Sequence, residues 1–167
     1  PTTIYGEQKL AIENYLKFSK SVSVILRLTK VFDVNLQDRT LVTSWLDSLL
    51  AGEEILCASD QFISPTYVVD VCRAIELLIE NKRSGIYHVC APITLSRYDL
   101  GLKVSNYFGF KKERVKKCSI LDFKFSEPRS SYSTLSVKKI QEEYNFTATP
   151  FEKSLELIKL NYKPKLR

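Results

Sequence analysis

Residues 22–28 read Val-Ser-Val-Ile-Leu-Arg-Leu, a short run that is β-branched and almost continuously apolar. A run of this length and character is typical of a β-strand that is buried on both faces, as strands of parallel sheets are. Arg27 lies at the end of the run and is either a structural arginine or a phosphate contact.

On either side of this run, the pattern alternates between strands and helices. Residues 55–58 and 85–89 predict two further strands, and residues 33–38 and 60–65 predict loops. Apolar periodicity predicts helices over 7–19, 41–51, 67–80, 97–109, 135–144 and 151–161. We therefore predict an α/β fold with a largely parallel sheet. Three strands leave two bare sheet edges, one of them near residues 22–28. We therefore expect the C-terminal part of a doubly wound, Rossmann-like parallel sheet together with a small, mainly helical substrate-binding lobe.

Composition narrows the class of protein. Hydrophobic residues make up 44% and charged residues 26% of the 167 residues, as in an ordinary globular domain. No apolar run approaches the roughly 18 residues of a membrane span, so we expect no membrane partner. The four cysteines are widely spaced and form no C-x-x-C pair. This favours free thiols in a reducing cytoplasm over a disulfide framework or a metal site.

The net charge of +6 suits either nucleic acid or a phosphate-bearing substrate. The basic run over residues 111–117 has no interleaved aromatic side chains for stacking on bases. We interpret it as a solvated surface and expect no nucleic-acid partner.

The stretch Tyr5-Gly6-Glu7-Gln8-Lys9 holds the candidate chemistry. Residues four apart on a helix lie on one face, so the Lys9 ammonium would lie near the Tyr5 phenol and favour its phenolate form. Such a phenol can donate a proton to a carbonyl oxygen while the carbonyl carbon receives a hydride. By spacing alone the pair is a weak signal, because such pairs occur by chance in most proteins and an ordinary helix surface explains them.

Six segments in order resemble one family. They are Tyr5 to Glu13 (Y-G-x-x-K-x-x-x-E), Ile25 to Phe32, Asp60 to Val71, Gly85-Ile86-Tyr87-His88, Ser96-Arg97-Tyr98-Asp99 and Tyr132 to Ser136. Together they resemble the C-terminal part of extended short-chain dehydrogenases/reductases of the dTDP-4-dehydrorhamnose reductase type. The resemblance covers nearly the whole chain.

The resemblance implies NAD(P)H-dependent reduction of a nucleotide-linked 4-keto-6-deoxy sugar, with NADP or NAD as cofactor. It implies Tyr5 and Lys9 as catalytic residues that also contact the cofactor, together with Leu28 and Thr29. It implies Lys30, Gln61 and Thr66 as substrate-binding residues. His88, the only histidine, is expected to be a core residue.

The sequence also departs from the family. It contains no Gly-rich βα turn of the kind that holds a dinucleotide pyrophosphate, and it has Lys30 where the family often has an aromatic residue. We therefore expect residues 1–167 to be the C-terminal portion of a reductase whose cofactor half is absent. Such a chain is expected to pair with that half or with a second copy. Two alternatives stay open: a non-catalytic regulatory subunit similar to the β-subunit of methionine adenosyltransferase, and an inactive fragment.

Overall fold

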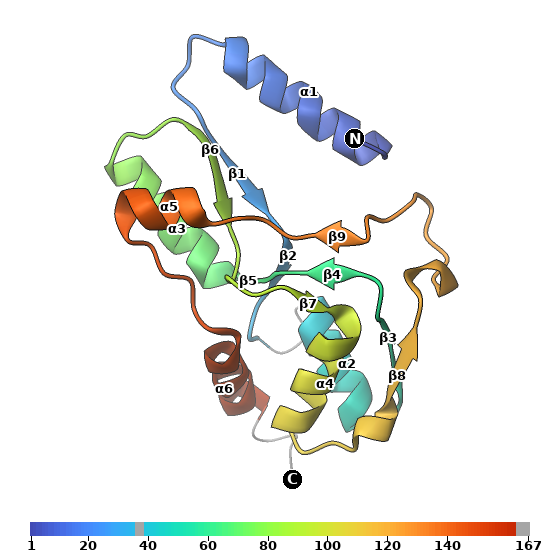
Figure 1. The fold of residues 1–167 in the computed structure, drawn as a ribbon. Helices are drawn as coiled ribbons and strands as arrows, with labels where there is room; N and C mark the ends of the chain where they lie inside the picture. Colours follow the sequence, from blue (N-terminus) through green and yellow to red (C-terminus); the bar gives the residue numbers. More distant parts are fainter. Residues whose placement is uncertain (36–38, 163–167) are drawn as a thin grey trace.

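The computed structural model describes residues 1–35 and 39–162, which form helices and short strands in alternation (Figure 1). The helices are α1 (Ile4–Phe18), α2 (Leu41–Leu50), α3 (Val68–Glu80), α4 (Arg97–Tyr107), α5 (Lys138–Tyr144) and α6 (Phe151–Tyr162), with short 3-10 turns at Lys112–Arg114 and Ile120–Asp122. The strands are β1 (Val24–Leu28), β2 (Lys30–Phe32), β3 (Ile55–Ala58), β4 (Phe62–Ile63), β5 (Pro65–Tyr67), β6 (Gly85–Val89), β7 (Leu95–Ser96), β8 (Val115–Cys118) and β9 (Tyr132–Ser133). The predicted α/β class is confirmed.

Two parallel strand pairs follow one another along the chain. Strand β1 pairs with β6, and after a single residue β2 pairs with β5. Helix α3 connects β5 to β6 and packs on them through Val71, Ala74 and Leu78. These side chains form one core cluster with Tyr87 and Val89 of β6 and with residues of and around α5.

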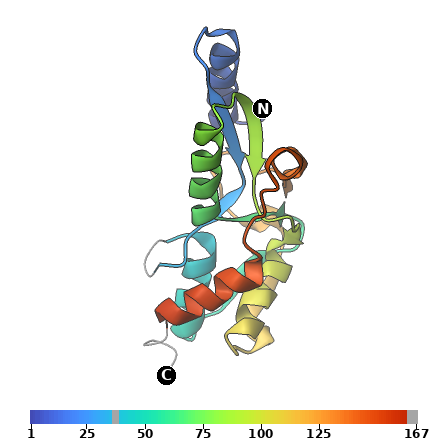
Figure 2. The same ribbon diagram turned by 90° about the vertical axis from the view of Figure 1, so that its left-hand side faces the viewer.

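The second core cluster lies at the other end of the molecule (Figures 1 and 2). Helices α2 and α4 pack against the parallel pair β3–β8, and α6 belongs to the same core cluster. Trp45, Leu46 and Leu49 of α2 are buried there. Between the two clusters lies a small sheet in the order β7-β4-β9.

The second cluster corresponds to the lobe that was expected to be mainly helical. That expectation was incomplete, because the strand at 55–58 belongs to this cluster. The strand pairs with β8, which was not predicted. In β8, Lys116 and Lys117 are exposed and only Val115 is fully buried. The run therefore resembles a solvated surface in sequence, although its backbone is paired.

Several faces predicted to be buried are open. Strand β1 is half-exposed instead of buried on both faces, and among the described residues it pairs only with β6. Helix α1 has no buried residue, with Tyr15 and Phe18 exposed by 74% and 81%. Ile75 and Ile79 of α3 are exposed as well. The apolar periodicity of these elements was read correctly as helix or strand, but nothing in the described residues covers these surfaces.

The predicted loops are partly ordered into strands. Residues 62–63 and 65–67 form β4 and β5, which are too short to show a sequence pattern. Of the predicted loop at 33–38, residues 36–38 lie outside the described residues, and residues 33–35 form no regular element. No helix within the described ranges is long and apolar enough to cross a bilayer.

The space around Gly101 of α4 is tightly filled by the second core cluster, so a larger residue at this position tests the packing. A Cβ at this position would lie 2.7 Å from Cys57 Sγ and 3.3 Å from Val115 Cγ1. Gly101→Ala would gain about 1 kcal/mol in an open helix, but here we expect a net loss of about 1–3 kcal/mol from overpacking. Urea unfolding measures the loss.

Cys57→Ala provides the control, because it removes the sulfur that the new methyl group would meet. We expect Gly101→Ala to be less destabilising in the Cys57→Ala background than alone. A Gly101→Ala protein as stable as the wild type would contradict the described packing of α4 on β3.

Candidate active site

Helix α1 presents the predicted Tyr5–Lys9 pair near its N-terminus. The Thr3 hydroxyl caps the helix by accepting a hydrogen bond from the Gly6 N–H at 3.0 Å. The Lys9 ammonium nitrogen lies 5.2 Å from the centroid of the Tyr5 ring, within the range of a cation–π contact. Tyr5 is 65% exposed and lines a cavity.

Thr29 marks the point where the chain passes from β1 to β2. Its hydroxyl donates a hydrogen bond to the Ser64 carbonyl and lies 2.7 Å from the Thr66 hydroxyl. Because the Thr29 proton is already used, Thr66 is the donor in the second bond. Thr66 is fully buried, so its side chain positions Thr29 from behind.

A cavity of about 510 Å³ lies where α1, this crossing and the loop before β9 meet. Its lining includes five residues expected from the sequence, namely Tyr5, Leu28, Thr29, Lys30 and Gln61. Lys9 and Thr66 do not line it. They lie behind Tyr5 and Thr29 respectively. The remaining lining residues are Thr2, Thr3, Ile63, Arg97, Phe125, Pro128, Arg129, Ser130 and Ser133.

Three cationic side chains face this cavity: Lys30, Arg97 and Arg129. Loss of water around the Lys30 ammonium lowers its pKa, and the charges of Arg97 and Arg129 lower it further. Burial likewise lowers the pKa of Arg97. No carboxylate is among the described residues that line the cavity. Like charges without an acidic partner give this cavity a positive potential, which favours an anionic ligand.

Arg97 is held by its surroundings. Its guanidinium carbon lies 5.8 Å from the Trp45 ring and 5.5 Å from the Phe123 ring, and Nη1 donates to Gln61 Oε1 at 3.1 Å. The Nε atom is buried and has no hydrogen-bond partner among the described residues. A buried donor without a partner is unfavourable, and an anion in the cavity is one group that could relieve it.

Gln61 has both ends of its amide engaged, since Nε2 also donates to the Ser130 carbonyl at 3.0 Å. Its side chain therefore joins Arg97 to the loop before β9. In this arrangement Gln61 lines the cavity as a positioning residue.

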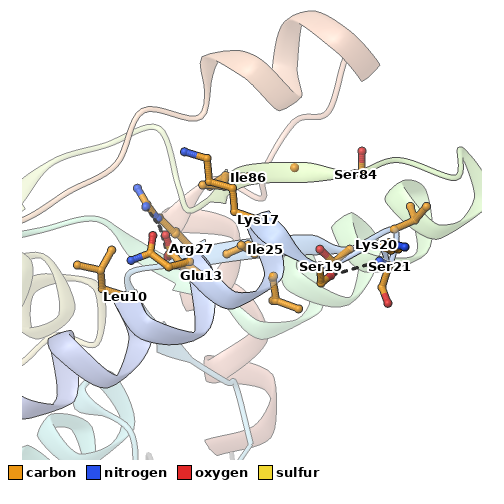
Figure 3. A pocket seen from close by; sticks show the side chains of 15 residues that line it. Leu10, Glu13, Lys17, Ser19, Lys20, Ser21, Ile25, Arg27, Ser84 and Ile86 are labelled. Carbon is orange, nitrogen blue, oxygen red and sulfur yellow. Dashed lines mark hydrogen bonds and ion pairs between the residues drawn. The ribbon is translucent and has the colours of Figure 1, made fainter.

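A second cavity, of about 640 Å³, separates α1 from β1 and β6 (Figure 3). Arg27 points across it to Glu13 and donates from Nε to Oε1 at 2.9 Å and from Nη2 to Oε2 at 2.5 Å. Of the two roles considered for Arg27, its contacts support the structural one. His88 neighbours Arg27 across the strand pair and is partly buried, with Nδ1 3.1 Å from the Ser136 carbonyl oxygen.

The sequence analysis missed Arg97 and the loop from Phe125 to Ser130. The signal for Arg97 was present in the segment Ser96-Arg97-Tyr98-Asp99, where the arginine opens a helix. The loop carried no periodicity and no motif, so only the folded chain brings Arg129 to the cavity.

Comparison with known proteins identifies the family and the fold. Residues 1–163 match the family described as "RmlD substrate binding domain". The spore coat polysaccharide biosynthesis protein SpsK of Bacillus subtilis is 28% identical over 85% of this chain and 49% of its own length. The dTDP-4-dehydrorhamnose reductase of Mycobacterium tuberculosis is 28% identical over 83% of this chain and 46% of its own length. The chain thus spans about half the length of the curated relatives it matches.

Among solved structures, dTDP-4-dehydrorhamnose reductase from Bacillus anthracis, in complex with NADP, superposes with a TM-score of 0.84. The two are 26% identical, and the match covers 96% of this chain and 56% of that one. The resemblance seen in the sequence and the Rossmann-like fold class are both confirmed.

The cation cluster predicts that inorganic pyrophosphate stabilises the protein. A ligand that binds only the folded state adds about 2.7 kcal/mol at a concentration of 100 Kd, which raises Tm by several degrees. Differential scanning calorimetry measures this rise. We expect Arg97→Gln and Arg129→Gln to reduce it strongly.

Lys112→Gln is the matched control, because it removes one exposed cation that does not line the cavity. It should leave the pyrophosphate-dependent rise unchanged. Equal rises in all three variants and the wild type would contradict a specific anion site in this cavity.

Proposed function

The chain belongs to the RmlD substrate binding domain family, and we therefore propose that the protein acts in the NAD(P)H-dependent reduction of a nucleotide-linked 4-keto-6-deoxy sugar. The observation that carries this proposal is the meeting of Tyr5 with Lys30, Arg97 and Arg129 around one cavity. A substrate for such a site needs a carbonyl for the phenol and negative charge for the cations. A keto sugar joined to a nucleoside diphosphate has both.

In this proposal the diphosphate lies against Arg97 and Arg129. Arginine suits this role because its planar guanidinium binds phosphate oxygens with two parallel hydrogen bonds. The aromatic rings of Trp45 and Phe123 hold the Arg97 side chain, so less conformational entropy is lost when the ligand binds. Lys30 adds a third charge on the side of the cavity formed by the β1–β2 crossing.

Tyr5 then acts on the keto oxygen. The bound nicotinamide supplies the hydride that forms the new C–H bond at the keto carbon. Tyr5 donates its phenolic proton to the oxygen, which becomes the hydroxyl of the reduced sugar. The Lys9 ammonium lies over the Tyr5 ring, 5.2 Å from its centroid, in the range of a cation–π contact. Acid catalysis of this kind typically contributes about 10²–10⁴-fold to the rate.

The side chains expected to hold NADP or NAD are compatible with that role. Lys9 is exposed, and no carboxylate in the described part of the chain lies within ion-pair distance of its ammonium. It is therefore able to bond the ribose hydroxyls of the cofactor. Leu28 and Thr29 line the cavity near Tyr5, where the nicotinamide would have to approach the sugar.

We propose further that pyrophosphate capture by a Gly-rich turn belongs to a part of the protein other than residues 1–167. This part would extend the sheet at the free edge of β1, as an additional parallel strand, and cover the apolar face of α1. The half-length match to the relatives supports this division. Homodimerisation through the same surfaces is the alternative.

Tyr5→Phe tests the catalytic assignment. The change removes only the hydroxyl, which acts in the transition state, so we expect kcat to fall by about two orders of magnitude or more with cofactor affinity nearly unchanged. The assay is NADPH oxidation with a dTDP-linked 4-keto-6-deoxy sugar, using the longest polypeptide that the gene encodes.

Tyr15→Phe on the same helix is the control and should be fully active, because Tyr15 lines neither cavity. Normal turnover by Tyr5→Phe would contradict the role of Tyr5. If the wild type oxidises no NADPH with dTDP- or UDP-linked keto sugars and copurifies with a synthetase, the regulatory alternative is supported instead.

A second test concerns residues 1–167 alone. We expect them to bind NADPH only weakly, since a lone ammonium such as Lys9 provides no cradle of backbone N–H groups for the pyrophosphate. Isothermal titration calorimetry measures the affinity, and light scattering reports self-association through the open β1 edge. Micromolar binding by a monomer would contradict the proposed division of the cofactor site.

A further inference from the structure

Helix α1 carries the proposed proton donor, yet hydrophobic packing against the other described residues does not hold it in place. None of its residues is buried in the described structure, and Ile12, Tyr15 and Phe18 are more than half exposed. Most helices in proteins are stabilised by burial of an apolar face. The position of Tyr5 over the cavity therefore depends on a different kind of contact.

The ion pair between Glu13 and Arg27 provides that contact. Arg27 belongs to β1, and its guanidinium donates hydrogen bonds to both carboxylate oxygens of Glu13 (Figure 3). The distances are 2.9 Å from Nε to Oε1 and 2.5 Å from Nη2 to Oε2. The hydrogen bond from Arg27 holds the pKa of the Glu13 carboxyl below its usual range. A two-point contact fixes direction as well as distance, which a lysine cannot do.

The spacing along α1 connects this ion pair to the site. Tyr5, Lys9 and Glu13 follow one another at intervals of four residues, so they lie along one side of the helix. Glu13 is about 12 Å along the helix axis from Tyr5. At the other end, the Ile4 N–H donates to Glu127 Oε1 at 3.1 Å, which places a carboxylate at the positive end of the helix dipole. Along α1, the Ile4–Glu127 hydrogen bond and the Glu13–Arg27 ion pair thus lie on either side of Tyr5 and Lys9.

Exposed ion pairs often contribute less than about 1 kcal/mol to stability. This pair differs in two respects: its geometry is bidentate, and the Glu13 side chain is only 18% exposed. The cavity of 640 Å³ also separates much of α1 from strands β1 and β6, so few other contacts between them stabilise the position of the helix.

We infer that Glu13 and Arg27 are positioning residues, which set the placement of α1 on β1 and so direct the Tyr5 hydroxyl into the cationic cavity. The inference rests on the proposed role of Tyr5 as proton donor. Its structural part, that the ion pair holds α1 in place, stands independently of that role.

Two measurements on the longest polypeptide that the gene encodes test it. The first is amide hydrogen exchange of residues 4–18, with α3 at residues 68–80 as the internal reference. The second is the steady-state kcat and KM for the keto sugar. The variants are Glu13→Gln, Arg27→Gln, Arg27→Lys and the charge reversal Glu13→Arg with Arg27→Glu.

We expect Glu13→Gln and Arg27→Gln to speed exchange in α1 at least about fivefold, as loss of charge-assisted hydrogen bonds predicts, while exchange in α3 stays unchanged. The value of kcat should fall with little change in KM, since the anion-binding residues are intact. Arg27→Lys should resemble Arg27→Gln, and the reversed pair should recover part of both losses.

Glu152→Gln is the matched control, because it breaks an exposed ion pair with Lys103 that lies away from α1. It should change neither measurement. Unchanged exchange in α1 for the Glu13 and Arg27 variants would overturn the inference, and faster exchange with normal kcat would overturn its catalytic part. If the wild type is inactive, the proposed function fails, and the exchange data alone decide whether the ion pair holds α1.

Discussion

The arrangement of the two parallel strand pairs β1–β6 and β2–β5, and with it one wall of the cavity, depends on how the backbone passes Thr29. Strand β1 ends at Leu28 and β2 begins at Lys30, so a single residue connects two parallel strand pairs. The Thr29 hydroxyl is fixed there by the Ser64 carbonyl and by the buried Thr66 hydroxyl. These bonds join segments that lie 35 and 37 residues apart in sequence. They align β2 with β5 and place Leu28, Thr29 and Lys30 in succession along one wall of the cavity.

Charge then determines what this wall can bind. Among the described residues, three cations and no carboxylate line the cavity, and the buried Arg97 Nε has no hydrogen-bond partner, which is unfavourable. Repulsion between the three cations makes the site less stable than a neutral one would be. A bound anion would relieve this repulsion. Tyr5 reaches the same cavity from a helix with no buried side chain. The two halves of the proposed chemistry, anion binding and proton donation, therefore rest on elements that differ in how far their side chains are buried.

The sequence alone predicted the elements with strong periodicity or a recognisable motif. Helices α3, α4 and α6 and strands β3 and β6 lie close to where the patterns of Ile55–Ala58, Gly85–Val89 and the apolar helical stripes place them. Tyr5, Leu28, Thr29, Lys30 and Gln61 were predicted from family resemblance, and the fold brings them to one cavity. Whether they act on substrate stays a prediction.

The remainder depended on contacts between distant segments. Strand β8 is visible only once β3 lies beside it, since its lysines give it the composition of a surface. Arg129 reaches the cavity because its loop is tied to Gln61, about 70 residues earlier in the chain. The open faces of α1 and β1 were unpredictable for a further reason: an apolar stripe is typical of a buried surface, and the described residues contain no segment that buries these two.

The measurement that tests the account most directly follows the hydride. The longest polypeptide that the gene encodes is incubated with NADPH that carries two deuterium atoms at C4 of the nicotinamide and with a dTDP-linked 4-keto-6-deoxy sugar, and the sugar is examined by NMR. We predict one deuterium on the former keto carbon, which now bears a hydroxyl; a sugar that is recovered unreduced, or reduced without deuterium, would contradict the account.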